Sequence, residues 1–267
     1  MLRNARAIRW TPWTALTTRA RFLSAYRTEV VGASGTQESR LAFYKDHARL
    51  SPWHDIPLRP SGNAARNVFN FVNEIPKGAR SKMEIATNEA TNPIKQDVKK
   101  GNLRFYHFDS LVNYGCIPQT WEDPAHVDAS THHGDNDPVD VCEIGSRVAA
   151  VGDVYPVKVI GVLGMIDEGE TDWKVIAIAL DDPLAETLND IDDLHAHAPN
   201  TVTEIRNWFR DYKIPDGKPP SVFAFDGQAK PRDFAVEVIE QTHTSWKQLV
   251  GSPAKAAKLW TPPASAA

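Results

Sequence analysis

The sequence predicts a mainly β protein with flanking helices, an α+β fold whose small, closed or partly closed β-structure has helices packed outside it. Two observations predict this class. Runs rich in β-forming residues occupy the middle of the chain, and apolar residues at helical spacing appear only in its last third. Strands first and helices last fit a small β-core with helices packed outside it.

The first predicted strand covers residues 68–75, where Val-Phe-Asn-Phe-Val-Asn-Glu-Ile alternates and is rich in β-formers. A turn at Pro76–Gly78 follows, and residues 81–85 are expected to return as the hairpin partner.

Two further β-rich runs cover residues 153–164 and 173–180, and the polar segment 167–172 is the turn between them. Because proline has no N–H to donate, Pro156 indicates an edge strand or a bulge in the first run.

The last third contains two predicted helices. Ile205, Trp208, Phe209 and Tyr212 recur at helical spacing after the candidate caps Asn200 or Thr201. A second stripe runs from Phe234 to Leu249 and is opened by Pro231. These aromatic residues are interpreted as core, and the acidic stretch 181–193 as a solvated helix face.

Composition excludes several classes of function. The 267 residues carry a formal net charge of −4, which argues against a general nucleic-acid binder. No run of 18 apolar residues is present, so no membrane insertion is expected. Cys116 and Cys142 have neither zinc-site spacing nor the number for a disulfide framework, and are expected to be reduced core thiols.

The chain divides into a leader, residues 1–30, one large domain, residues 31–251, and a flexible tail, residues 252–267. The leader contains six arginines and no acid before Glu29, with apolar residues that could share one helical face. This pattern is typical of a mitochondrial transit peptide and predicts a mitochondrial matrix protein.

The most informative segment is Gly134-Asp-Asn-Asp-Pro-Val-Asp140. Asp135 and Asp137 would point the same way on an extended chain, and Pro138 indicates a loop that enters a strand. Two like charges at about 4 Å repel by about 4 kcal/mol at an effective dielectric near 20, so the carboxylates must separate, share protons or bind cations. Oxygen ligands favour hard ions such as Mg²⁺ or Mn²⁺, although a solvated acidic loop is the alternative.

Two other clusters extend this pattern. Residues 167–174 place several acids and Lys174 at a tight turn, and residues 74–84 place Glu74, Lys82 and Glu84 around another. Arg104, Tyr114, Tyr212 and Lys213 add hydrogen-bond donors. Acids that hold metals beside donors for phosphate oxygens suit a metal–phosphate complex. No nucleotide-binding glycine motif and no GxSxG motif is present.

At these residues the sequence resembles the soluble family I inorganic pyrophosphatases of the eukaryotic type, in particular a mitochondrial form. The resemblance runs from about Phe69 to Leu249 and depends on five matching segments: residues 135–140, 92–97, 113–124, 167–174 and 212–219. It implies an OB-like closed β-barrel, diphosphate as the substrate, and hydrolysis to two phosphates by a metal-activated water with several Mg²⁺ ions.

The resemblance also implies a role for each candidate residue. Asp137 would orient and deprotonate the attacking water. Asp135, Asp140 and Asp172 would hold the metal pair, Glu84 and Asp167 would bind further ions together with Asp172, and Glu74 would support them. The phosphoryl groups would be bound by Lys82, Arg104, Tyr114, Lys174, Tyr212 and Lys213.

The chain departs from the family pattern between Arg104 and Asn113, where it is a few residues shorter and Ser110 replaces a tyrosine near the substrate. The alternative function is therefore a catalytically weakened relative that binds Mg²⁺ and phosphate but turns over poorly. A hydrolase of a different phosphoanhydride is a further alternative. Gly78 stands where eukaryotic relatives often have an aromatic residue between subunits, so a homodimer is a possible rather than a required partner.

Overall fold

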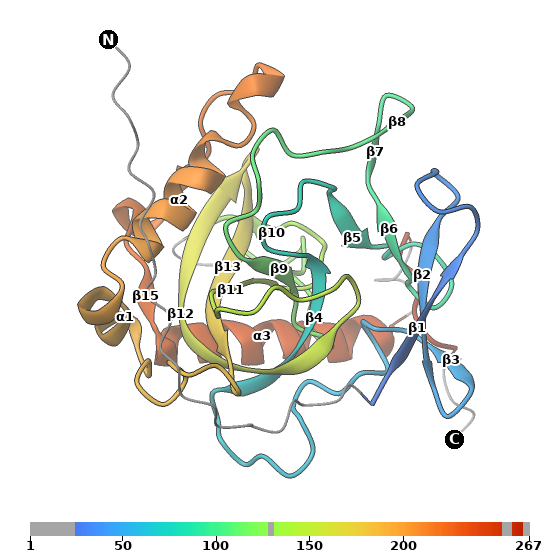
Figure 1. Cartoon of the computed structure of the whole chain (residues 1–267), viewed down its shortest axis with the longest axis horizontal. Helices are drawn as coiled ribbons and strands as arrows, with labels where there is room; N and C mark the ends of the chain where they lie inside the picture. Colours follow the sequence, from blue (N-terminus) through green and yellow to red (C-terminus); the bar gives the residue numbers. More distant parts are fainter. Residues whose placement is uncertain (1–24, 128–130, 253–257, 264–267) are drawn as a thin grey trace.

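Five strands close into a ring at the centre of the molecule (Figure 1). Their order is β13-β11-β9-β4-β12, and direct pairing of β12 with β13 closes the ring. The strands are β4 (Val68–Ile75), β9 (Asn113–Cys116), β11 (Asp140–Glu143), β12 (Val154–Asp167) and β13 (Glu170–Ala179). The predicted closed β-barrel is confirmed. The structure describes residues 25–127, 131–252 and 258–263, in a computed structural model.

The long antiparallel hairpin β12–β13 is the largest element of the barrel. Its register runs from Val157 opposite Ala179 to Asp167 opposite Glu170, with an irregularity between Val159 and Gly161. Of the two interpretations of Pro156, the edge strand is wrong, because β12 pairs with β4 as well as with β13, whereas the irregularity within β12 agrees with the bulge. Pro156 itself faces Asn70 of β4, whose N–H donates instead to the carbonyl of Leu58 at 2.9 Å.

The predicted hairpin between residues 68–75 and 81–85 does not form. Strand β5 (Met83–Ile85) pairs with β6 (Ile94–Gln96), because β9 and β12 already occupy the two edges of β4. The close approach of β4 and β9 requires glycine at position 115, where a Cβ atom would lie 2.0 Å from the carbonyl oxygen of Val72.

A second sheet lies beside the barrel, and residues 27–50, for which the sequence predicted no strand, supply three of its five strands. It contains β1 (Arg27–Val31), β2 (Arg40–Lys45), β6 and β5, with β3 (Ala48–Leu50) paired to β2. Phe43 and Trp53 are fully buried beneath it, and the Trp53 indole donates to the carbonyl of Thr120 at 2.7 Å. Most of the predicted transit segment lies outside the described residues, and β1 begins inside its last part.

Three helices cover the barrel from outside. Helix α2 (Thr201–Asp211) and helix α3 (Arg232–Val250) confirm the two predicted helices, and α3 crosses beneath β12 in Figure 1. Ala235, Val238 and Ile239 of α3 belong to the same buried cluster as Phe71 and Val157 of the barrel. Helix α1 (Ile191–His197) is short.

The prediction that the acidic stretch 181–193 forms a solvated helix face is wrong for most of its length. Turns and bends occupy it as far as Asp190, and α1 begins only at Ile191. Asp182 is buried there and accepts hydrogen bonds from the backbone and hydroxyl of Ser146, which holds the segment against the barrel. The remaining elements are β7 (Val98–Lys99), β8 (Asn102–Leu103), β10 (His133–Gly134), β14 (Val222–Phe223), β15 (Lys230–Pro231), η1 (Ile214–Asp216) and η2 (Phe225–Gly227).

None of the helices among the described residues is both long and apolar enough to cross a membrane.

Candidate active site

A cavity of about 480 Å³ opens at one end of the barrel, between the ring and the sheet that contains β5 and β6. Every candidate residue named from the sequence lines it: Glu74, Lys82, Glu84, Arg104, Tyr114, Asp135, Asp137, Asp140, Asp167, Asp172, Lys174, Tyr212 and Lys213. Residues that lie as much as 139 positions apart, from Glu74 to Lys213, therefore line the same cavity. The barrel gathers acids, cations and phenols into a single site.

Lys174 lies at the base of the cavity and is the most buried cation in it, with 2% of its surface exposed. Strand pairing places it opposite Asp140, since β11 and β13 are parallel neighbours. Its ammonium contacts the carboxylates of Asp140, at 2.5 Å, and Asp172, and the hydroxyl of Tyr114 at 2.8 Å. Tyr114 in turn donates to Asp140. One buried cation thus holds two acids and a phenol in fixed positions.

The loop between Gly134 and Val139 places Asp135 and Asp137 above this base. The chain is not extended here, because Asn136 adopts a positive φ of 76° and the Asp137 N–H turns back to Asp135 Oδ1 at 3.0 Å. Segment 120–122 holds the loop from outside. The Trp121 indole donates to Asn136 Oδ1 at 3.1 Å, and the backbone of Glu122 exchanges hydrogen bonds with residues 136 and 137. Pro138 precedes β11, as predicted.

A second charged group forms the wall made by β5 and the segment after β6. Lys82 contacts Glu84 at 2.5 Å and Asp97 at 3.2 Å, and Arg104 donates to Asp97 at 2.9 Å. Asp97 therefore fixes two cations side by side, which sequence analysis did not foresee. Two adjacent cations form a binding position for a multiply charged anion.

A third group lies opposite, where the β12–β13 turn meets the end of α2. Lys213 contacts both oxygens of Asp167 at 2.6 Å, and the Tyr212 hydroxyl donates to Asp167 at 3.3 Å. Tyr212 is held by Trp208, which stacks on it at 5.6 Å between ring centroids. Both residues are thereby fixed at the cavity rim.

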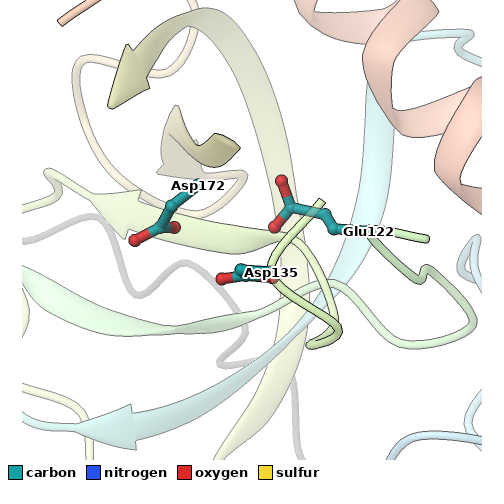
Figure 2. A group of neighbouring side chains, drawn as sticks. All are labelled: Glu122, Asp135 and Asp172. Atoms are coloured by element: carbon teal, nitrogen blue, oxygen red, sulfur yellow. The ribbon is translucent and has the colours of Figure 1, made fainter. Parts of the chain in front are cut away.

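The carboxylates of Glu122, Asp135 and Asp172 lie close enough to one another to hold a metal ion (Figure 2). Each offers an oxygen within 4.8 Å of the others. Glu74 lies nearby on β4, where its carboxylate accepts a hydrogen bond from the backbone of Ile85 at 2.8 Å. An oxygen-only donor set of this kind fits Mg²⁺ or Mn²⁺.

Comparison with known proteins agrees with this geometry. The family profile described as inorganic pyrophosphatase matches residues 71–247. An inorganic pyrophosphatase of Dictyostelium discoideum is 49% identical over 86% of this chain and 82% of that protein. The mouse inorganic pyrophosphatase 2, mitochondrial, is 49% identical over 86% of this chain and 76% of that protein.

A solved structure extends the comparison to three dimensions. The truncated vacuolar soluble pyrophosphatase of Trypanosoma cruzi, in complex with PPi, superposes with a TM-score of 0.81 at 40% identity, covering 92% of this chain and 99% of that one. The chain belongs to the inorganic pyrophosphatase family. It is accordingly an enzyme, a hydrolase of the inorganic pyrophosphatase class.

The clustering of acids in this pyrophosphatase shifts their proton affinities. Enclosure by the cavity walls, followed by the charges of Asp140 and Glu84, raises the pKa of Asp137 to about 7. Burial raises the pKa of Asp172 to about 7 as well, although Lys174 acts in the opposite direction. Burial also raises the pKa of Glu74, of Asp135 and of Glu122. These five acids therefore bind their protons more tightly than free carboxyl groups do.

Several cavity residues were not predicted from the sequence. Tyr106 lines the cavity beside Tyr212, while Ser110 lies in a separate small hollow, where its hydroxyl donates to the carbonyl of Val112 at 2.7 Å. Lys258 and Leu259 of the C-terminal segment also line the cavity. The next residue, Trp260, holds this segment in place by donating its backbone N–H to the carbonyl of Thr87. No local pattern marks these residues, because distant segments bring them to the site.

The raised pKa values predict how the stability of the metal-free pyrophosphatase depends on pH. For Asp172 the folded carboxyl, with a pKa of about 7, binds its proton more tightly than the unfolded one, at 3.8. The folded state therefore holds more protons between about pH 4 and pH 7, and stability falls as pH rises through this window. We expect a loss of about 1–3 kcal/mol, or several degrees in Tm, between pH 5 and pH 8 in EDTA.

Thermal denaturation followed by circular dichroism measures this loss. The Asp172→Asn variant serves as the control, and its Tm should vary less over the same range. A wild-type Tm that stays constant or rises from pH 5 to pH 8 would contradict the assigned pKa directions.

Proposed function

We propose that this enzyme hydrolyses inorganic pyrophosphate to two phosphates and requires Mg²⁺. The observation that carries the proposal is the single cavity in which acids alternate with paired cations. The Trypanosoma cruzi relative was solved in complex with PPi, which supports the same substrate for this chain. Pyrophosphate is small and multiply charged, so its binding needs many short-range charged contacts rather than an apolar surface.

The carboxylates would hold the metal ions, and the donor set present fits them. Asp135, Asp140 and Asp172 would hold one pair of ions, and Glu84 and Asp167 would bind further ions together with Asp172, with Glu74 supporting them from β4. When bound, Mg²⁺ supplies two effects: it lowers the pKa of the attacking water and it neutralises phosphate oxygens. Lys174 fixes Asp140 and Asp172 in advance, so little reorganisation is needed.

The protein side chains would then position the substrate. The Lys82–Arg104 pair would bind one phosphoryl group, and Lys174 and Tyr114 would contact the other. Tyr212 and Lys213 would donate to the departing phosphate. Asp137 would accept the proton of the attacking water, because a carboxylate with a pKa near 7 is well matched to that task at neutral pH. Attack in line with the leaving phosphate needs no covalent enzyme intermediate.

The structure gives no support to the alternative of a weakened relative. The replacement of tyrosine by Ser110 in the shortened segment leaves the cavity with another phenol, that of Tyr106. Burial raises the pKa of Tyr106 to about 12 although the charges of Lys82 and Lys174 act against it. The phenol thus keeps its proton at neutral pH, and we propose that it donates a hydrogen bond to a phosphate oxygen.

We also propose that residues 1–30 direct the protein to the mitochondrial matrix. The support is the arginine-rich composition of the segment, which has no acid before Glu29, and the mitochondrial name of the mouse relative. The homodimer expected from the sequence stays a prediction.

The function is tested by phosphate release from pyrophosphate, measured with Mg²⁺ and with EDTA, on protein that lacks residues 1–24. We expect release with Mg²⁺ and none with EDTA. Replacement Asp137→Asn should lower kcat by about 10²- to 10⁴-fold, the usual range for loss of a general base, while Mg²⁺ affinity stays within a few-fold. Asp46→Asn, in an exposed turn with a positive φ that asparagine tolerates, is the matched control. Undiminished turnover of the Asp137 variant would remove its assigned role.

The role of Tyr106 is tested by Tyr106→Phe, which deletes one hydroxyl and keeps the ring against Trp208 and Tyr212. Loss of one hydrogen bond to a charged group should lower kcat/KM by about 10-fold or more with an unchanged Tm. Tyr44→Phe on β2, outside the cavity, should have no effect. Equal activity of the two variants would exclude Tyr106 from the reaction.

Localisation is tested by fusing residues 1–30 to a fluorescent protein in a eukaryotic cell. Import into mitochondria is expected, and replacement of Arg3, Arg6, Arg9, Arg19 and Arg21 by glutamine should abolish it. A diffuse cytosolic signal from the unmodified segment would contradict the proposal.

A further inference from the structure

Glu122 is a buried acid that the proposed reaction does not use. Its side chain is on the loop between β9 and β10, and only 3% of the residue is exposed. It lies beside the cavity rather than on its lining and also contacts a second, small hollow that contains His126 and His132. Its carboxylate points toward Asp135 and Asp172, as Figure 2 shows.

The two oxygens of Glu122 have different surroundings. Oε1 accepts a hydrogen bond from the backbone N–H of Trp173 at 3.0 Å, and this contact fixes the carboxylate against β13. Oε2 is fully buried and has no hydrogen-bond partner within the described part of the chain. Burial of an unpaired carboxylate oxygen costs free energy, because the oxygen gives up its hydrogen bonds with water.

A purely structural role does not account for this arrangement. A structural contact between the 120–122 segment and β13 needs only Oε1 as the acceptor. A neutral glutamine would supply this acceptor without adding a charge next to Asp135 and Asp172. Glu122 nevertheless carries an acid here and offers an oxygen within 4.8 Å of oxygens of both Asp135 and Asp172, a spacing at which three carboxylates can share a cation or its hydration shell.

We propose that Glu122 is an additional carboxylate of the metal site, with Oε2 coordinating the ion held by Asp135 and Asp172 or accepting a hydrogen bond from one of its waters. This inference rests on the proposed Mg²⁺ dependence. Mg²⁺ keeps several waters in protein sites, and an outer carboxylate commonly orients such waters. The Trp173 N–H sets the direction of the carboxylate, so the metal end of the site is connected to the β12–β13 hairpin.

The test is Mg²⁺ binding by isothermal titration calorimetry on protein stripped of metal, with no substrate and no turnover. Glu122→Gln keeps the acceptor for Trp173 N–H and removes the charge. We expect this variant to bind Mg²⁺ about 10- to 100-fold more weakly at one site, the range for loss of an outer-shell partner. Glu237→Gln on the exposed side of α3 is the matched control and should bind like the wild type.

Thermal denaturation adds a second readout on the same variants. Without metal, Glu122→Gln should be at least as stable as the wild type, because one of three neighbouring acids has lost its charge. With saturating Mg²⁺ it should gain less, by about 1.4 kcal/mol for each tenfold loss of affinity. An affinity within twofold of the wild type would overturn the inference. Absence of Mg²⁺ binding by the wild type itself would instead overturn the proposed metal dependence.

If Glu122→Gln does not fold, the wild-type protein decides the question. In a crystal structure with Mn²⁺ bound, Glu122 Oε2 should lie about 2.0–2.2 Å from an ion, or at hydrogen-bond distance, about 2.6–3.2 Å, from a water on that ion. An Oε2 with neither contact would overturn the inference.

Discussion

The site depends on holding a group of carboxylates together in one cavity against their mutual repulsion. Burial, together with the charges of neighbouring acids such as Asp140, raises the pKa values of Asp135, Asp137 and Asp172. Lys174 offsets part of this cost from the base of the cavity, where it contacts two of the four acids and is almost fully buried. A buried pair of this kind contributes little net stability, but removal of one partner leaves an uncompensated charge. Function, more than stability, accounts for the arrangement.

Two kinds of structure supply the site. Barrel strands place Tyr114, Asp140, Asp172 and Lys174, whose relative positions follow from strand register and so are rigid. A loop supplies Asp135 and Asp137, but Glu122 holds its backbone by two hydrogen bonds and the Trp121 indole holds the side chain of Asn136. The segment 120–122 is therefore as important for the geometry of the acids as the acids themselves.

The cations of the cavity are paired with acids in two peripheral groups, Lys82 and Arg104 with Asp97, and Lys213 with Asp167. Such pairs hold the long side chains in extended positions at the wall. A multiply charged anion that enters the cavity meets donors that already point inward, and less side-chain entropy is lost on binding. Tyr106 is held in the cavity wall in a similar way, because its ring contacts that of Trp208 edge-on.

The sequence alone determined the β-then-α order, the long 154–179 hairpin, helices α2 and α3, and the acids, cations and phenols of the proposed reaction other than Tyr106. These features follow from local periodicity and from motifs whose residue types indicate their chemistry. Only the tertiary structure decided the pairing of β5 with β6, the strands formed by residues 27–50, and the roles of Glu122, Tyr106 and Asp97. Strand partners depend on which edges other strands leave open, and burial and hydrogen bonding of a lone acid or tyrosine depend on segments far away in the chain.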